Sequence, residues 1–138
     1  MTFGKLKEWS PLVLRIALAG VLIAHGWSKY TGGVDKFAGF VGNSFPAATF
    51  FAWLVTGVEV VGGLAILLGL WTRAVALLVA GQFLIINLYV KWGAAWFGGG
   101  SKELDVLVMA IGLSLLFTGA GSKLNLEKKW LGTDRLSK

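Results

Sequence analysis

Residues 47–70 read AATFFAWLVTGVEVVGGLAILLGL, an apolar run whose single charge, Glu59, lies near its middle. About 20 predominantly apolar residues are enough for an α-helix to cross the roughly 30 Å hydrocarbon core of a bilayer. Backbone polar groups inside lipid must be satisfied within the segment itself, so a helix is the expected conformation. The run therefore predicts a membrane-spanning helix that carries a carboxylate at mid-depth.

Three further apolar runs flank this one, at residues 11–30, 73–92 and 104–119, and the last is the shortest. The 138-residue chain is 56% apolar and only 14% charged, with a mean hydropathy of +0.73. This composition is typical of an integral membrane protein. We predict an all-α fold, an antiparallel four-helix bundle forming one domain over residues 1–138, with helices at about 11–30, 47–70, 73–92 and 104–119.

Two shorter segments have amphipathic patterns. Residues 34–41 place Val34, Phe37, Phe40 and Val41 on one face at helical spacing, and residues 122–133 set Trp130 and several leucines among basic side chains. Both patterns indicate short helices in the membrane interface. A loop packed against protein is the alternative for the first segment, and a frayed tail is the alternative for the second.

The basic residues are unevenly distributed. If both termini are cytoplasmic, nine of the thirteen Lys and Arg residues lie on the inner side, which satisfies the positive-inside rule. We predict a multi-pass protein of the cell (plasma) membrane with both termini in the cytoplasm. The net charge of +6 then indicates membrane lipids as partners and no nucleic acid. Arg15 and Arg73, close to the inner boundary, are predicted lipid anchors.

Glu59 requires a partner, because a charge at the bilayer centre costs about 2.5–3.5 kcal/mol on insertion scales. The first helix carries His25 and Lys29 on one face, and the third carries Asn87 and Lys91 on one face. The fourth helix begins with Glu103 and Asp105, whose side chains are about 200° apart around the helix axis, so only one of them can face inward. We predict that Glu59 pairs with His25 or with Lys29, one turn further out. The predicted polar site lies in the outer half of the bundle and is formed from His25, Lys29, Glu59, Asn87, Lys91, Glu103 and Asp105.

This cluster has two interpretations. His25, the only histidine, can exchange protons near neutral pH, and a His25–Glu59 pair can bind a quinone carbonyl or transfer a proton. Alternatively, the charges are buried ion pairs that fix helix register, and breaking one such pair costs about 3–5 kcal/mol. Glu103 has a further explanation, since an acid in the first turn complements the helix dipole. The residues alone leave these alternatives open.

Several short segments, in a fixed order, resemble the DoxX family of small four-helix membrane proteins. They are Leu14–Leu18 (LRIAL), His25-Gly26 followed by Lys29, Glu59–Gly63 (EVVGG), Gly69–Arg73 (GLWTR), and Gly98–Gly100 leading to Glu103. The resemblance implies a link to membrane redox chemistry, since family members are associated with a terminal quinol oxidase and with thiosulfate:quinone oxidoreductase, and others accompany oxidative-stress enzymes. Residue by residue, the resemblance extends to the positions that match the family pattern, namely Arg15, His25, Lys29, Glu59, Arg73 and Glu103.

The residue content argues against a self-contained redox centre. One histidine cannot supply bis-histidine haem ligation, the absence of cysteine removes thiolate clusters, and no dinucleotide fingerprint follows a strand. We expect no metal site, no covalently bound cofactor, and a quinone as the candidate ligand.

The sequence therefore predicts a small accessory subunit of a membrane respiratory or redox complex, with other subunits or further copies of itself as partners. Whether the chain is an enzyme stays open; at most it is a subunit of a quinone-linked oxidoreductase. The alternative is a non-catalytic assembly or lipid-organising protein whose polar cluster is structural. A small-solute transporter is less favoured, because four short helices without repeats rarely provide alternating access.

Overall fold

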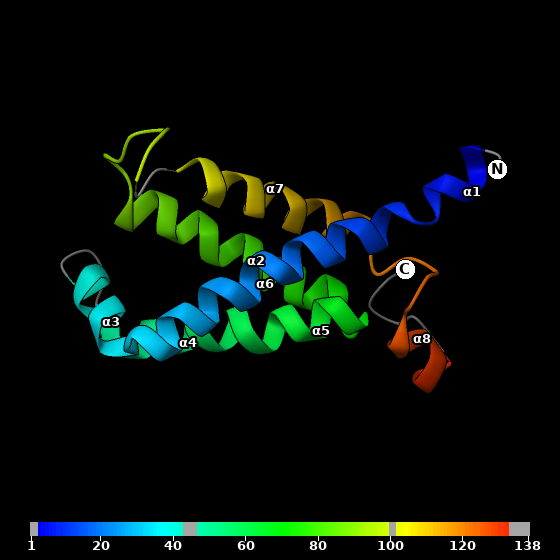
Figure 1. Ribbon diagram of the computed structural model, residues 1–138, viewed down its shortest axis with the longest axis horizontal. Coiled ribbons are helices and arrows are strands. Elements are labelled where there is room, and N and C mark those ends of the chain that lie inside the picture. Colours follow the sequence, from blue (N-terminus) through cyan, green and yellow to red (C-terminus); the bar gives the residue numbers. More distant parts are fainter. Residues whose placement is uncertain (1–2, 43–46, 100–101, 133–138) are drawn as a thin grey trace.

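The computed structural model describes residues 3–42, 47–99 and 102–132, without the side chain of Leu131, and every regular element in these ranges is helical (Figure 1). The elements are α1 (Phe3–Lys7), α2 (Ser10–Gly32), α3 (Val34–Gly42), α4 (Ala48–Gly57), η1 (Val58–Gly62), α5 (Gly63–Leu68), α6 (Thr72–Ile85), η2 (Ile86–Val90), α7 (Glu103–Thr118) and α8 (Leu126–Leu131). The predicted all-α class is confirmed. Elements α4, η1 and α5 form one continuous rod, and α6 and η2 form another.

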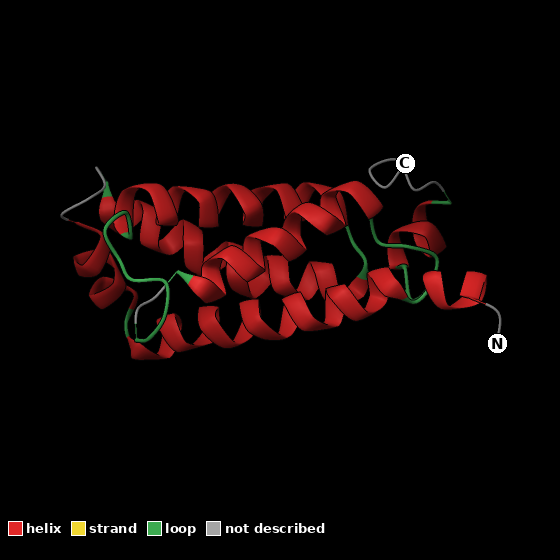
Figure 2. Ribbon diagram, turned by 90° about the horizontal axis from the view of Figure 1, so that it is seen from above, coloured by secondary structure: helices red, strands yellow, loops and turns green. Residues whose placement is uncertain are grey.

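Three helices are long and apolar enough to cross a membrane: Phe3–Gly32, Ala48–Leu68 and Thr72–Val90. The 16-residue α7 is shorter and packs along α6 and against α2. Figure 2 shows the long helices lying alongside one another, along the long axis of the molecule. Elements α1 and α8 lie at one end of the molecule, and α3 lies at the other (Figure 1). A fourth crossing by α7 and the cytoplasmic location of both termini remain predictions.

The core lies where α2, α5, α6 and α7 meet. Leu18, Leu22, Ile66, Val79 and Leu115 are at most 1% exposed there. Many large apolar side chains instead point outward, as expected of a surface that faces lipid tails. Two helices approach closely at Gly26, where an added Cβ would lie 2.8 Å from the Glu59 Cβ and 3.0 Å from the Val60 nitrogen. This glycine therefore sets the spacing between α2 and the rod that carries Glu59.

Both long hairpin rods are interrupted by a five-residue π-helical segment, η1 in one and η2 in the other. A π segment forms i→i+5 hydrogen bonds and often occurs at functional sites. Its wider turn changes which side chains share a face compared with a regular α-helix. Both segments contribute to the candidate site, η1 through Glu59 and η2 through Ile86 and Val90.

The two amphipathic segments are both helical but differ in length from the prediction. Helix α3 packs its buried Val34, Ala38 and Val41 against α4, while Phe40 stays 59% exposed. Helix α8 begins only at Leu126, and residue 133 of the predicted segment lies outside the described residues. Each segment therefore contacts protein on one side, and its contact with lipid remains a prediction.

Candidate intramembrane polar site

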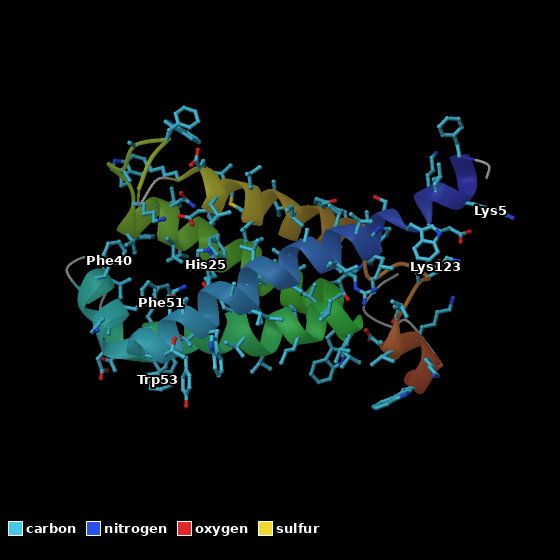
Figure 3. All side chains as sticks on the ribbon, viewed as in Figure 1. Lys5, His25, Phe40, Phe51, Trp53 and Lys123 are labelled. Atoms are coloured by element: carbon cyan, nitrogen blue, oxygen red, sulfur yellow. The ribbon has the colours of Figure 1, made fainter. Side chains whose placement is uncertain are left out.

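A cavity of about 550 Å³ opens in the half of the bundle that carries α3, between α2, η1, η2 and the start of α7. Phe37, Phe40 and Phe83 supply much of its apolar wall. Six of the seven predicted site residues line it: His25, Lys29, Glu59, Lys91, Glu103 and Asp105. The volume lies within the range of about 300–1,000 Å³ that is usual for small-molecule pockets. Figure 3 labels His25 and Phe40 in this half of the molecule.

Glu59 is 1% exposed, and both of its carboxylate oxygens have partners. The Lys29 Nζ lies 2.6 Å from Oε2, and the Gln82 Nε2 donates to Oε1 at 3.1 Å. Lys29 also lies over the Phe37 ring, with Nζ 5.0 Å from the ring centroid. The partner expected for a carboxylate at this depth is therefore present, and it comes from α2 one turn after His25.

A second ion pair crosses the cavity between the end of η2 and α7. The Lys91 Nζ lies 2.7 Å from the Asp105 Oδ2, and Asp105 is buried. Glu103 also lines the cavity, but its side chain is exposed. As the 200° separation predicts, only one of these two acids is buried in the bundle.

Asn87 differs from the prediction. It does not line the cavity, and its Nδ2 instead donates to the Phe83 carbonyl at 2.8 Å. The expectation that Asn87 and Lys91 share a face assumed 3.6 residues per turn. The bond to the Phe83 carbonyl holds the Asn87 amide on its own helix, whereas the longer Lys91 side chain, at the end of η2, reaches Asp105 across the cavity.

His25 lines the cavity without a fixed partner. Within the described ranges, no hydrogen bond or ion pair involves its imidazole, and the side chain is exposed. Of the two partners predicted for Glu59, His25 and Lys29, the structure shows Lys29. The imidazole keeps a donor and an acceptor that a bound molecule can use.

Gln82 is the residue of this site that the sequence reasoning missed. It lies in α6, is 8% exposed, and holds the Glu59 oxygen that Lys29 does not. A glutamine inside an apolar span is a reason to look for a contact between helices, because such side chains hydrogen-bond across helices. That reasoning would have found it.

Arg15 also differs from the prediction, since its side chain is 0% exposed and does not reach the surface. Its five N–H groups donate to five backbone carbonyls, namely those of Ile66, Leu67, Ala120, Lys123 and Leu124, at 2.6–3.0 Å. Helix C-termini leave carbonyls without helical partners, and a guanidinium has the same number of donors as this set has acceptors. Arg15 therefore joins the end of α5 to the segment after α7.

Arg73 lies at the start of α6, and its Nη2 donates to the Phe117 carbonyl at 3.3 Å. This contact joins α6 to the end of α7. Binding of Arg73 to lipid phosphates remains a prediction.

Comparison with known proteins agrees with the resemblance seen in the sequence. The DoxX family profile matches residues 10–92. The chain is 30% identical over 119 residues to “Putative oxidoreductase CatD” of Bacillus subtilis (strain 168), covering 85% of this chain and 84% of that protein. It is 39% identical over 132 residues to “Inner membrane protein YqjF” of Escherichia coli (strain K12), covering 91% and 98%. No solved structure matches it. The chain is a membrane protein that belongs to the DoxX family.

Proposed function

We propose that this protein is a small accessory subunit of a membrane redox complex, in which the cavity beside α3 forms part of a quinone site. The observation that carries the proposal is His25, whose imidazole lines a cavity with aromatic walls and has no hydrogen-bond or ion-pair partner among the residues that the structure describes. The printed name of the CatD relative, an oxidoreductase, supports the same class of chemistry.

The lining suits a ligand with an apolar body and polar oxygens. A quinone ring can pack against the phenylalanine side chains, while its carbonyl oxygens accept hydrogen bonds from His25 or a lysine ammonium. The ion pairs Lys29–Glu59 and Lys91–Asp105 balance the charge around that ring. A reduced quinone must take up protons, and His25 can deliver one, whereas the electrons come from the partner subunit that holds the cofactor.

A purely structural role has its own support. Lys29–Glu59 joins α2 to η1, and Lys91–Asp105 joins the end of η2 to α7, so each pair connects two neighbouring helices. Such pairs fix the register of neighbouring helices without any chemistry. The protein would then organise its membrane neighbours and would not bind a quinone.

The substitutions His25→Gln and Glu59→Gln separate the two functions. Both keep hydrogen-bonding capacity and remove titration, so we expect folded protein with weakened quinone binding and slower quinone-dependent electron transfer in the whole complex. Glu8→Gln, at the other end of the molecule, is the matched control and should leave both unchanged. Normal quinone binding and electron transfer in both stable variants would rule out the quinone site.

The structural role predicts a different pattern. Replacing Lys29 or Glu59 alone with an apolar residue of similar size should lower thermal stability, because the other charge remains buried without its partner. Replacing both together should restore most of the loss. Measuring all three variants in detergent tests this role independently of quinone binding.

A further inference from the structure

A second concave surface lies at the end of the molecule opposite the cavity. It is a groove of about 510 Å³ beside α8, and its walls come from three parts of the chain. These are Leu12 and Ile16 of α2, Leu67 and Leu68 of α5, and Leu124 and Lys129 of the C-terminal segment. It is separate from the proposed quinone site.

The hydrogen bonds of Arg15 hold the walls of this groove together. Its guanidinium Nη2 donates to the Leu67 carbonyl at 2.6 Å and to the Leu124 carbonyl at 2.8 Å. Leu124 has a φ of 47°, a left-handed conformation that costs a non-glycine residue free energy. With its carbonyl held by Arg15, its side chain is 72% exposed on the groove. The groove is therefore a fixed part of the fold.

The charge of the groove is one-sided. Among the lining residues that the structure describes, Lys129 is the only charged one, and none is acidic. Lys129 is exposed and forms no ion pair with any described residue. The nearby Lys123 is different, because it contacts Glu8 at 3.1 Å and lies over the Trp9 ring. A leucine-rich floor with one available ammonium at its edge complements an amphiphile that has an anionic head.

From this geometry we propose that the groove binds one anionic phospholipid from the leaflet on the α8 side. An acyl chain lies over Ile16, Leu67, Leu68 and Leu124, and the phosphate contacts Lys129 and the Ser122 hydroxyl. Hydrocarbon is the expected neighbour of these leucines in a membrane, and an anionic head selects the lipid that neutralises Lys129. Arg15 does not bind this lipid but builds its site.

The test uses the full-length protein in mild detergent, titrated with phosphatidylglycerol or with phosphatidylcholine of the same acyl chains. Native mass spectrometry counts the bound lipids. We expect one phosphatidylglycerol to be retained in preference to phosphatidylcholine. Lys129→Gln should weaken its binding about fivefold, the value expected for losing one cation near an anionic lipid surface. Lys128→Gln, the neighbouring exposed lysine that does not line the groove, should change binding less than about twofold.

A second variant tests the apolar part without changing charge. Ile16→Trp fills the groove from α2 and should displace the lipid, whereas Val13→Trp, also exposed on α2 but outside the groove, should not. Equal losses in Lys129→Gln and Lys128→Gln would indicate diffuse electrostatic attraction and overturn the proposal. Equal retention of the two lipids would overturn it as well, as would full binding by Ile16→Trp.

Discussion

Arg15→Lys should destabilise the protein markedly although it preserves the charge. An ammonium has three donors where the guanidinium has five, so at least two of the five carbonyls lose their partner. Each buried polar group left without a partner costs about 1–3 kcal/mol, which gives about 2–4 kcal/mol after some local rearrangement. For a chain of this size the loss corresponds to a fall in Tm of roughly 10 °C.

The assay is thermal unfolding in detergent, followed by tryptophan fluorescence, together with limited trypsin digestion. Lys128 and Lys129 are exposed but lie in helix α8, so release of the segment after α7 should unfold that helix and let trypsin cleave there at temperatures where the rest of the bundle is still folded. Arg73→Lys is the matched control, because the contact of Arg73 with the Phe117 carbonyl is longer, at 3.3 Å. A Tm within about 2 °C of wild type, with unchanged digestion, would refute the reasoning that the five carbonyls depend on Arg15.

Three further predictions follow from the described geometry. Gly26→Ala should destabilise the protein by about 1–3 kcal/mol, because its Cβ would meet Glu59 and the Val60 backbone nitrogen, whereas Gly20→Ala, with nothing within 4 Å, should be neutral in the same melt. Gln82→Leu should lower stability by about 1–3 kcal/mol while Gln82→Glu lowers it more, since a second carboxylate would face Glu59; the reverse order in thermal melts would contradict the hydrogen bond between them. Because the chain has no cysteine, single cysteines at Thr2, Ser137 and Gly99 can be labelled in intact cells; Gly99→Cys alone should react from outside, and reaction of either terminal cysteine would contradict the predicted topology.

The sequence predicts those parts of the site that follow from the free-energy cost of burying a charged side chain inside the membrane. Glu59 stands alone in an apolar run, so a basic partner was required, and Lys29 provides it. The separation of Glu103 and Asp105 around a helix likewise predicts that only one of them is buried. The first inference uses only the low polarity of lipid, and the second uses the regular α-helical geometry of α7.

The parts that could not be predicted depend on particular side-chain and backbone contacts. Asn87 lies outside the cavity with its Nδ2 bonded to the Phe83 carbonyl of the same helix, and helical spacing does not predict this local hydrogen bond. Arg15 is buried because carbonyls from the end of α5 and from the segment after α7 both accept hydrogen bonds from it. These acceptors are backbone groups, which every residue type has, so the sequence does not mark them. A prediction made from the first helix alone therefore places Arg15 at the lipid surface.

The burial of Arg15 has a consequence for biogenesis. Arg15 is synthesised early, but its acceptor at Ala120 follows 105 residues later. Until that segment has been translated, the guanidinium lacks three of its five acceptors, and a long basic side chain near the end of a helix can meanwhile extend to the lipid phosphates. The first span is therefore inserted long before Arg15 can form its hydrogen bonds to the segment after α7, because that segment is synthesised near the end of translation. A ribosome that stops before residue 120 should therefore leave an inserted chain in which Arg15 has at most two of its five acceptors, and this chain should be less stable than the complete protein.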